Sequence, residues 1–207
     1  MEERYFAIGT CPKRDKVADY LEFGEVYKSA LKTLMRHFEM PDEDMQKEID
    51  ERTDPGILLL PDHDYGIAPL AFLFRHYIEI KLKGLILYKG GSWEPTHDVR
   101  WLLEQLKNIL NSEREGGDNR LSAETCIIIN EFQKLDKNSD GFRYPYGKKG
   151  DPSLQNDSAL LKYFNSLSTF KQMVNYVVDD FTNLEGDIDA EKECRETLAS
   201  MSNNQPS

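Results

Sequence analysis

One apolar stretch that also carries five charged or histidine side chains limits most strongly what this chain can fold into. Residues 69–88 read PLAFLFRHYIEIKLKGLILY and begin at a proline, which suits the first turn of a helix. Gly90 and Gly91 follow and would end that helix. Apolar side chains cover most of its circumference, as in helices that lie at the centre of a bundle. We therefore predict a central helix over 69–88.

Four of the five fall on one side of this predicted helix, and only Lys81 points elsewhere. The four are Arg75, His76, Glu79 and Lys83. At about 100° per residue they lie inside one arc of about 100°. In one interpretation the arc is the exposed face of an amphipathic helix, with ion pairs worth about 0.2–0.5 kcal/mol each. In the other it faces a cleft or a partner subunit, where partial desolvation suits the groups to binding or chemistry.

The rest of the sequence predicts an all-α protein, a bundle of about five main helices. Apolar residues recur at helical spacing, and neither strand alternation of any length nor an internal repeat is present. The helices are predicted over residues 15–39, 69–88, 97–110, 122–135 and 157–184. Asp15, Thr96 and Ser122 lie at the starts of three of them and are the predicted N-caps.

Charge is unevenly distributed and helps to divide the chain. The net charge is −11, and residues 179–207 hold 8 acidic and 2 basic side chains. This balance excludes a generic nucleic-acid binder that neutralises phosphates over its whole surface. We predict an acidic N-terminal helical extension at 1–60, a helical core at 61–185 and an acidic, partly disordered tail at 186–207.

The cysteines and the N-terminus indicate where such a chain works. Cys11, Cys126 and Cys194 are odd in number and far apart, which argues against a disulfide framework and suits a reducing compartment. The start MEERYF lacks the features of a signal peptide, and no apolar run reaches the roughly 20 residues of a membrane helix. We expect a cytoplasmic protein that makes no membrane contact.

Two further polar clusters could carry chemistry. PTHDVRWLL, residues 95–103, places His97 and Asp98 at a helix start. DGFRYPYGKKGD, residues 140–151, combines basic residues with aromatic ones, a pattern typical of single-stranded nucleic-acid binding. From this second cluster Arg143, Tyr144 and Lys148 are candidate substrate contacts. The alternative is a turn whose aromatic side chains cover the edge of the core.

These three clusters, in this order, resemble the HEPN superfamily, compact helical bundles of prokaryotic toxin, abortive-infection and antiviral systems. The matching pieces are FLFRHYIEIKLKGLI (72–86), HDVRWLLEQL (97–106) and FRYP (142–145). The resemblance implies a HEPN-like bundle and a metal-independent endoribonuclease that acts as a homodimer. In that family an arginine and a histidine, four to six residues apart on a late helix, meet across the dimer interface.

The sequence departs from this family pattern at the catalytic pair. Arg75 and His76 are adjacent, and the last predicted helix holds no histidine and only one arginine, Arg195. A rebuilt site would use His76 or His97 as the proton donor and acceptor, Arg75 and Arg143 on phosphate, and Glu79 to orient one of them. Of these residues, His76, His97, Arg75 and Glu79 are the candidate catalytic residues.

The remaining candidates complete two alternative functions. Lys83, Asp98, Arg143, Tyr144 and Lys148 are the candidate substrate-binding residues. In the enzyme they would hold RNA; in the alternative, a non-catalytic module, they would hold RNA or a nucleotide in the same cleft. A third role is an antitoxin-type partner of a protein encoded nearby. We predict no cofactor and no metal site, because the His–Asp pairs at 62–64 and 97–98 lack a regular ligand spacing.

Overall fold

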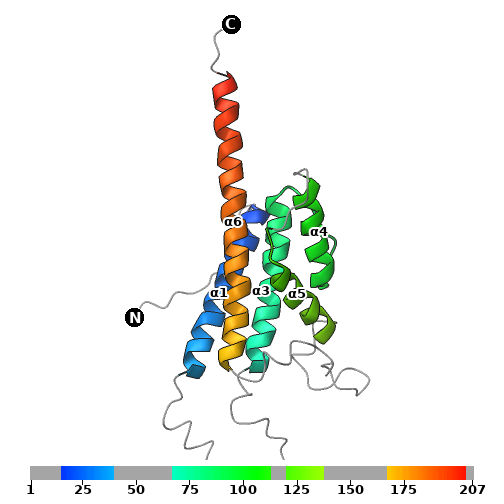
Figure 1. Cartoon of the computed structure of the whole chain (residues 1–207), viewed down its shortest axis with the longest axis vertical. Coiled ribbons are helices and arrows are strands. Elements are labelled where there is room, and N and C mark those ends of the chain that lie inside the picture. Colours follow the sequence, from blue (N-terminus) through cyan, green and yellow to red (C-terminus); the bar gives the residue numbers. More distant parts are fainter. Residues whose placement is uncertain (1–14, 40–66, 113–119, 138–166, 204–207) are drawn as a thin grey trace, which may run out of the picture.

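The computed structural model of the chain is an all-α bundle, as the sequence predicts. It describes residues 15–39, 67–112, 120–137 and 167–203, and these hold five helices and no strand. The helices are α1 (Lys16–Glu39), α3 (Ile67–Tyr88), α4 (Val99–Ser112), α5 (Ala123–Leu135) and α6 (Leu167–Asn203) (Figure 1).

Helix α3 is the centre of the bundle, which confirms the prediction for residues 69–88. It contacts α1, α4 and α6, and α4 and α5 cover one side of it while α1 and α6 cover the other (Figure 1). Phe74 lies fully buried in the core, with its ring centroid 5.3 Å from that of Phe132 on α5 and 6.1 Å from that of Phe170 on α6. Edge-to-face rings at these distances pack three helices around one side chain.

The predicted N-caps of α1 and α5 are confirmed, and that of α4 is wrong. Asp15 Oδ1 accepts a hydrogen bond from Val17 N at 3.0 Å, and Ser122 Oγ accepts one from Thr125 N at 3.1 Å. At α4 the cap is Asp98, whose Oδ1 accepts from Trp101 N at 2.9 Å. Thr96, the predicted cap, instead accepts from the backbone N–H of Asp98 itself.

The glycines after α3 end it as predicted. Gly90 has φ of +74°, a left-handed conformation that glycine adopts without a steric cost. Its N–H donates to Leu87 O, and that of Gly91 donates to Ile86 O, each at 2.9 Å. This pair of bonds is the Schellman pattern, and it turns the chain back toward the start of α4.

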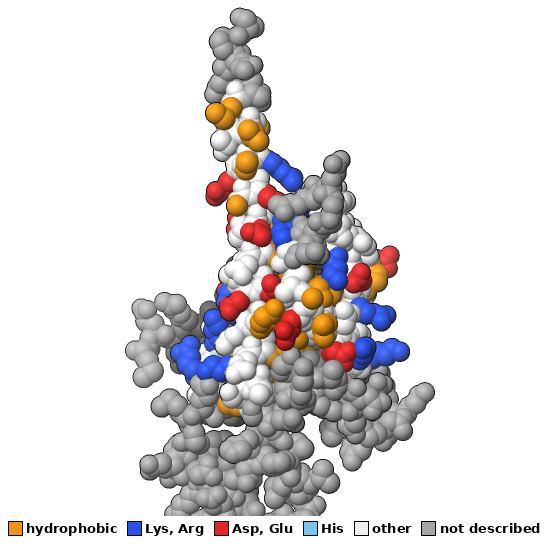
Figure 2. Space-filling model, viewed as in Figure 1, with side chains coloured by type: hydrophobic (Ala, Val, Ile, Leu, Met, Phe, Trp, Pro, Cys, Tyr) orange, Lys and Arg blue, Asp and Glu red, His pale blue; other side chains and the backbone are white. Residues whose placement is uncertain are grey.

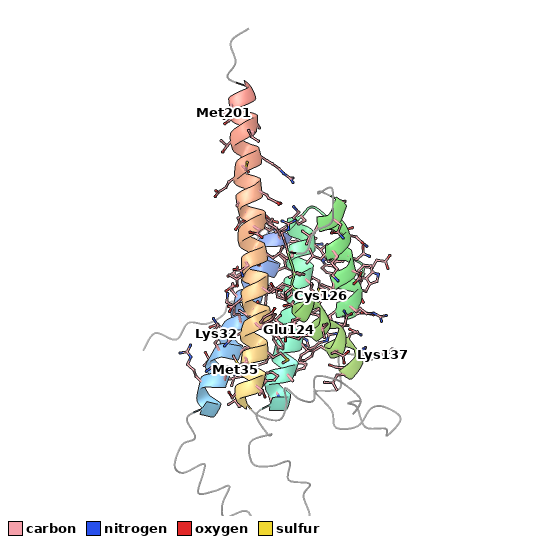
Figure 3. All side chains as sticks on the ribbon, in the orientation of Figure 1. Lys32, Met35, Glu124, Cys126, Lys137 and Met201 are labelled. Carbon is pink, nitrogen blue, oxygen red and sulfur yellow. The ribbon has the colours of Figure 1, made fainter. Side chains whose placement is uncertain are left out.

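Helix α6 runs past the end of the bundle (Figure 1). It has 37 residues and continues to Asn203, so residues 186–203 of the predicted acidic tail are helical. Hydrophobic side chains lie exposed on the protruding part (Figure 2), and Met201, 66% exposed, marks its far end (Figure 3). Residues 204–207 lie outside the described part of the chain.

The predicted N-terminal extension contributes to the core. Helix α1 packs along α3, and Leu31 and Met35 are buried between the helices. Residues 1–14 and 40–66 lie outside the described part. None of the described helices combines the length and the apolar character needed to cross a membrane.

A buried lysine ties α1, α3 and α6 together. Lys81 is 1% exposed, and its Nζ donates to Glu25 Oε1 of α1 at 3.0 Å and to Glu185 Oε1 of α6 at 2.7 Å. Its side chain lies against Gly24, where a Cβ atom would stand 2.8 Å from Lys81 Cδ. The glycine therefore provides the space through which the lysine reaches both carboxylates.

We expect Gly24→Ala to lower the free energy of unfolding by about 1–3 kcal/mol, because Lys81 is held at its far end and cannot yield to the new methyl group. Gly186→Ala is the matched control, since Gly186 is also helical but has nothing within 4 Å of a Cβ atom. That change should raise the free energy by about 0.5–1 kcal/mol through helix propensity. Urea denaturation measures the free energy of unfolding of both variants. If the two substitutions changed it equally, the close approach of Lys81 to Gly24 would not contribute to stability.

Candidate functional site

Three of the four side chains in the polar arc of α3 are buried. Arg75 is 0% exposed, Glu79 6% and Lys83 7%. The interpretation of the arc as an exposed amphipathic face is therefore wrong for these three. Charges at this depth are costly unless each has a partner of opposite charge or a full set of hydrogen bonds. Their contacts consequently define how the surrounding segments are placed.

Glu79 is the centre of this cluster. Its Oε2 accepts from Arg75 Nη1 at 3.2 Å, and its Oε1 accepts from Lys83 Nζ at 2.7 Å. The imidazole of His97, from the segment before α4, places Nδ1 3.0 Å from the same Oε1. One carboxylate thus joins two cations of its own helix to a histidine 18 residues further along the chain.

The surroundings of Glu79 keep its carboxylate ionised. Burial alone would raise the pKa of Glu79, but the hydrogen bond and charge of Lys83, with the charges of Arg75 and His97, outweigh it and lower the pKa below its ordinary value. An ionised Glu79 accepts hydrogen bonds only. Its contact with His97 therefore requires a proton on Nδ1, which leaves Nε2 as the nitrogen that can exchange a proton with a ligand.

Arg75 holds the backbone that carries His97. Its Nη2 donates to the carbonyl oxygen of His97 and, at 3.4 Å, to Gln133 Oε1. Burial lowers the pKa of Arg75, against the charges of Glu79, Asp136 and Asp98, yet a guanidinium stays protonated in proteins. Because both terminal nitrogens donate inside the protein and the residue is fully buried, Arg75 does not reach a substrate phosphate. Its place is that of a positioning residue.

Gln133 belongs to the site and was missed in the sequence. It is 7% exposed, its Oε1 accepts from Val99 N at 2.9 Å, and its Nε2 donates to Lys137 O at 3.0 Å. It therefore links the first residue of α4 to the end of α5. The available signal was its spacing: Gln133 follows Ile129 by four residues, which places an amide on the apolar face of its helix.

His97 is the exposed member of the cluster. Its side chain is 68% exposed, whereas that of Glu79 beneath it is 7% exposed. The segment that carries it is fixed at two points, by Arg75 at the His97 carbonyl and by the capping of α4 through Asp98. An imidazole in solvent, oriented by a buried carboxylate, can act as a general base and then as a general acid.

His76 lies apart from this cluster. Its Nδ1 is 3.3 Å from Phe72 O, and its ring lies 6.0 Å from that of Tyr27 on α1 and 4.4 Å from that of Phe72. The structure thus turns His76 toward α1, while His97 approaches α3 from the α4 side. Of the two candidate proton donors, His97 is the one that the structure places with its Nδ1 against the carboxylate of Glu79.

Some of the remaining candidates lie in the described part of the chain and some lie outside it. Lys83 pairs with Glu79, and its Nζ lies 4.8 Å from the centre of the Trp93 ring, a cation–π contact. Asp98 serves as the cap of α4. Arg143, Tyr144 and Lys148 lie outside the described residues. Within the described ranges, no group of three or more histidine, cysteine or carboxylate side chains could hold a metal ion.

Comparisons of the chain with family models, with curated proteins and with solved structures found no match. The site is therefore interpreted from its own geometry: a buried Arg–Glu–Lys cluster, closed on one side by Gln133 and topped by an exposed imidazole.

We expect Glu79→Gln to lower the free energy of unfolding by about 3 kcal/mol at pH 7, because it leaves two buried cations without their carboxylate. The pKa of Glu79 is lower in the folded than in the unfolded state. Its contribution is therefore complete above the unfolded pKa of about 4.3 and is lost as the pH falls through the folded pKa. Below that pH, urea denaturation should therefore give a smaller difference in the free energy of unfolding between Glu79→Gln and the unmodified protein.

Glu104→Gln is the control for this experiment, since Glu104 pairs with Lys107 but its side chain is 55% exposed. This substitution should change the free energy of unfolding by no more than about 0.5 kcal/mol, both at pH 7 and at acid pH. A deficit in Glu79→Gln that stays constant down to acid pH would contradict a role for the charge of Glu79.

Proposed function

We propose that this chain is a HEPN-like protein that acts on RNA as a metal-independent endoribonuclease in a prokaryotic defence or toxin system. The observation that carries the proposal is the Glu79–His97 pair, a buried and ionised carboxylate that orients an exposed imidazole. The proposal takes its substrate, its homodimeric state and its biological setting from the sequence resemblance. The geometry supports it by providing one group able to move protons.

In the proposed reaction His97 takes the proton of a ribose 2′-hydroxyl at Nε2. The 2′-oxygen forms a bond to phosphorus while the bond from phosphorus to the 5′-oxygen breaks. The imidazolium then returns its proton to the departing 5′-oxygen, which yields a 2′,3′-cyclic phosphate and a free 5′-hydroxyl. Glu79 stabilises the imidazolium between the two transfers, as a carboxylate does for a catalytic histidine.

Phosphate binding in this proposal does not involve Arg75. Both terminal nitrogens of that side chain donate within the protein, so it supports the His97 backbone. We assign the phosphate contacts to Arg143 and Lys148 and base stacking to Tyr144, as their interleaved sequence suggests.

The burial of Arg75 also favours a second candidate, a module that binds RNA or a nucleotide without cutting it. Family enzymes place an arginine on the reacting phosphate, and here the one candidate arginine beside a histidine is fully buried. In this candidate the Glu79–His97 pair would fix a binding surface and would move no proton.

We expect His97→Gln to reduce RNA cleavage in EDTA by at least about 100-fold, because it removes the general acid and base. The dissociation constant for the same RNA should stay within about threefold, since glutamine is polar and similar in size. His76→Gln is the matched control and should leave cleavage unchanged, because the ring of His76 packs against Phe72 and toward Tyr27 of α1 and not beside His97. Gel analysis of a labelled RNA and fluorescence anisotropy measure the two quantities.

Each other outcome selects a different function. Metal-free RNA binding without cleavage, weakened by Arg143→Ala, would support the binding module. Cleavage that persists in His97→Gln would contradict the assignment of His97 as the general acid and base. A protein that neither binds nor cuts RNA and binds no nucleotide would leave the antitoxin-type partner as the remaining role.

A further inference from the structure

Three aromatic side chains form a row along one side of α1. Tyr20, Phe23 and Tyr27 are spaced three and four residues apart, so they lie within an arc of about 60° and about 5 Å from one another along the helix axis. Tyr20 and Tyr27 are partly buried, whereas Phe23 is 57% exposed. This aromatic row therefore presents an exposed phenyl ring between two rings that are held by packing.

Both ends of the aromatic row reach the polar arc of α3. The ring of Tyr27 stacks with that of His76 at a centroid distance of 6.0 Å. The ring of Tyr20 meets that of Trp93 edge-to-face at 5.4 Å, and the ammonium group of Lys83 lies 4.8 Å from the centre of the same Trp93 ring. The row consequently runs alongside the arc instead of facing away from it.

Phe23 lies at about the level of Glu79. His76 precedes Glu79 on α3 by three residues and Lys83 follows it by four, and the two ends of the row reach these two positions. Helix α1 thus approaches the arc from one side, while His97 approaches it from the α4 side. An exposed phenyl ring and an exposed imidazole are therefore placed on the two sides of one buried carboxylate.

We propose that the aromatic row binds unpaired nucleobases of the RNA strand that reacts at His97, with one base stacked on Phe23. The inference rests on the RNA activity proposed above for His97. Aromatic side chains bind unpaired bases by stacking, and they accept any of the bases because each has a π-face. Phe23 has no hydrogen-bonding group, so this contact should hold the strand with little preference for one base.

The charges on α1 indicate how such a strand is oriented. Asp19 and Glu22 lie on the outer side of the aromatic row, where their carboxylates repel phosphate groups. Burial and, after it, the charge of Glu79 raise the pKa of Tyr20, so its phenol is neutral and adds no further negative charge. The bases should therefore face α1, and the phosphates should lie on the side of His97.

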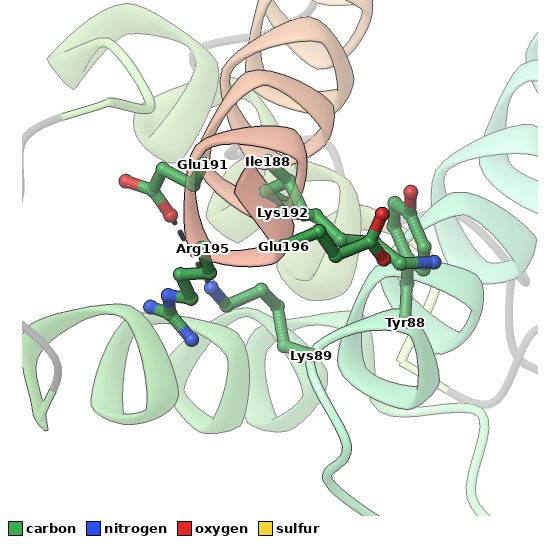
Figure 4. Close-up of a pocket in the computed structure, with 7 residues that line it drawn as sticks. All are labelled: Tyr88, Lys89, Ile188, Glu191, Lys192, Arg195 and Glu196. Atoms are coloured by element: carbon green, nitrogen blue, oxygen red, sulfur yellow. Dashed lines mark hydrogen bonds and ion pairs between the residues drawn. The ribbon is translucent and has the colours of Figure 1, made fainter. Parts of the chain in front are cut away.

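The pocket where the end of α3 meets α6 lacks such a row (Figure 4). One aromatic ring, that of Tyr88, lies there among charged side chains of both signs. Its hydroxyl group donates to Asp189, so the ring is held in an internal contact. A single ring surrounded by charges offers no path for successive bases, which places the base-binding surface on α1.

Contact with a second copy of the chain is the competing explanation for the exposure of Phe23. Val26, three residues further along α1, is 58% exposed, and an apolar contact between copies would cover both side chains. Such a contact would make the oligomeric state depend on Phe23. Stacking would instead make the affinity for a strand depend on whether that strand carries bases.

The test is fluorescence anisotropy of the full chain with two labelled 2′-O-methyl strands of about eight nucleotides. Both lack the 2′-hydroxyl nucleophile; one is an oligoadenosine and the other has the same backbone without bases. Phe23→Ala should weaken binding of the oligoadenosine by about tenfold, the loss of one stacked base, and should change binding of the strand without bases by less than about twofold. Phe23→Trp, which keeps an aromatic face, should retain the affinity for oligoadenosine.

Tyr176→Ala is the matched control, because Tyr176 is an aromatic residue on α6 that is 43% exposed. Its loss should leave both affinities unchanged. Far-UV circular dichroism verifies that each variant keeps its helix content, and sedimentation velocity gives the oligomeric state of each.

The proposal is overturned if the unmodified protein shows no saturable binding of oligoadenosine up to about 1 mM. It is also overturned if Phe23→Ala binds oligoadenosine as tightly as the unmodified protein, or loses equal affinity for both strands. A change of oligomeric state in Phe23→Ala without a change in affinity would overturn it in favour of a contact between copies.

Cleavage of an RNA with free 2′-hydroxyl groups, measured in EDTA, separates this proposal from the proposed enzyme. If oligoadenosine binding depends on Phe23 while the RNA stays intact, the aromatic row stands and the endoribonuclease does not. If the RNA is cut and Phe23→Ala changes neither cleavage nor oligoadenosine binding, the endoribonuclease stands and the aromatic row does not.

Discussion

The burial of charge on the central helix is the constraint on which this structure depends. Helix α3 carries Arg75, Lys81 and Lys83 into the interior, and an uncompensated charge at that depth costs several kcal/mol. Compensation comes largely from other segments: Glu25 and Glu185 approach Lys81, while the carbonyl of His97 and Gln133 approach Arg75. Apolar packing alone would allow the helices to slide against one another, whereas these contacts are satisfied in one arrangement only. The buried charges of α3 thus determine both how the helices pack and how the candidate site is built.

The sequence predicted most of the helices because their signals are local. Apolar spacing located five helices, and the side chains of Asp15 and Ser122 and the glycines after α3 marked their ends. The α4 cap was misplaced because Thr96 and Asp98 are both good N-caps, and only the tertiary position of the chain decides between them. The helical part of the predicted tail was missed for a related reason. Its polar composition resembles disorder, and its continuation from a packed helix is not visible in composition.

The candidate site was predicted in part, and the errors have a common physical cause. A helical wheel gives the direction of a side chain but not what it meets, so Arg75 and His76 were both predicted to take part in the site. In the structure Arg75 turns inward to a carbonyl and an amide, and His76 turns toward α1. Gln133 entered the site through backbone contacts, which no side-chain motif records. The pairing of His97 with Glu79, across 18 residues, required the path of the segment between α3 and α4.

Helix α6 has one further consequence, which concerns how firmly its two halves are held. Its first half contributes Phe170, Val177 and Phe181 to the interior, whereas beyond Glu191 every described side chain is exposed. The outer turns keep their shape by main-chain bonds and by local links such as that from Thr197 Oγ1 to Glu193 O. A helix end supported mainly in this way frays from its free end. Amide protons along this single element should therefore exchange with solvent in a gradient, fastest near Asn203 and slowest where the helix meets the bundle.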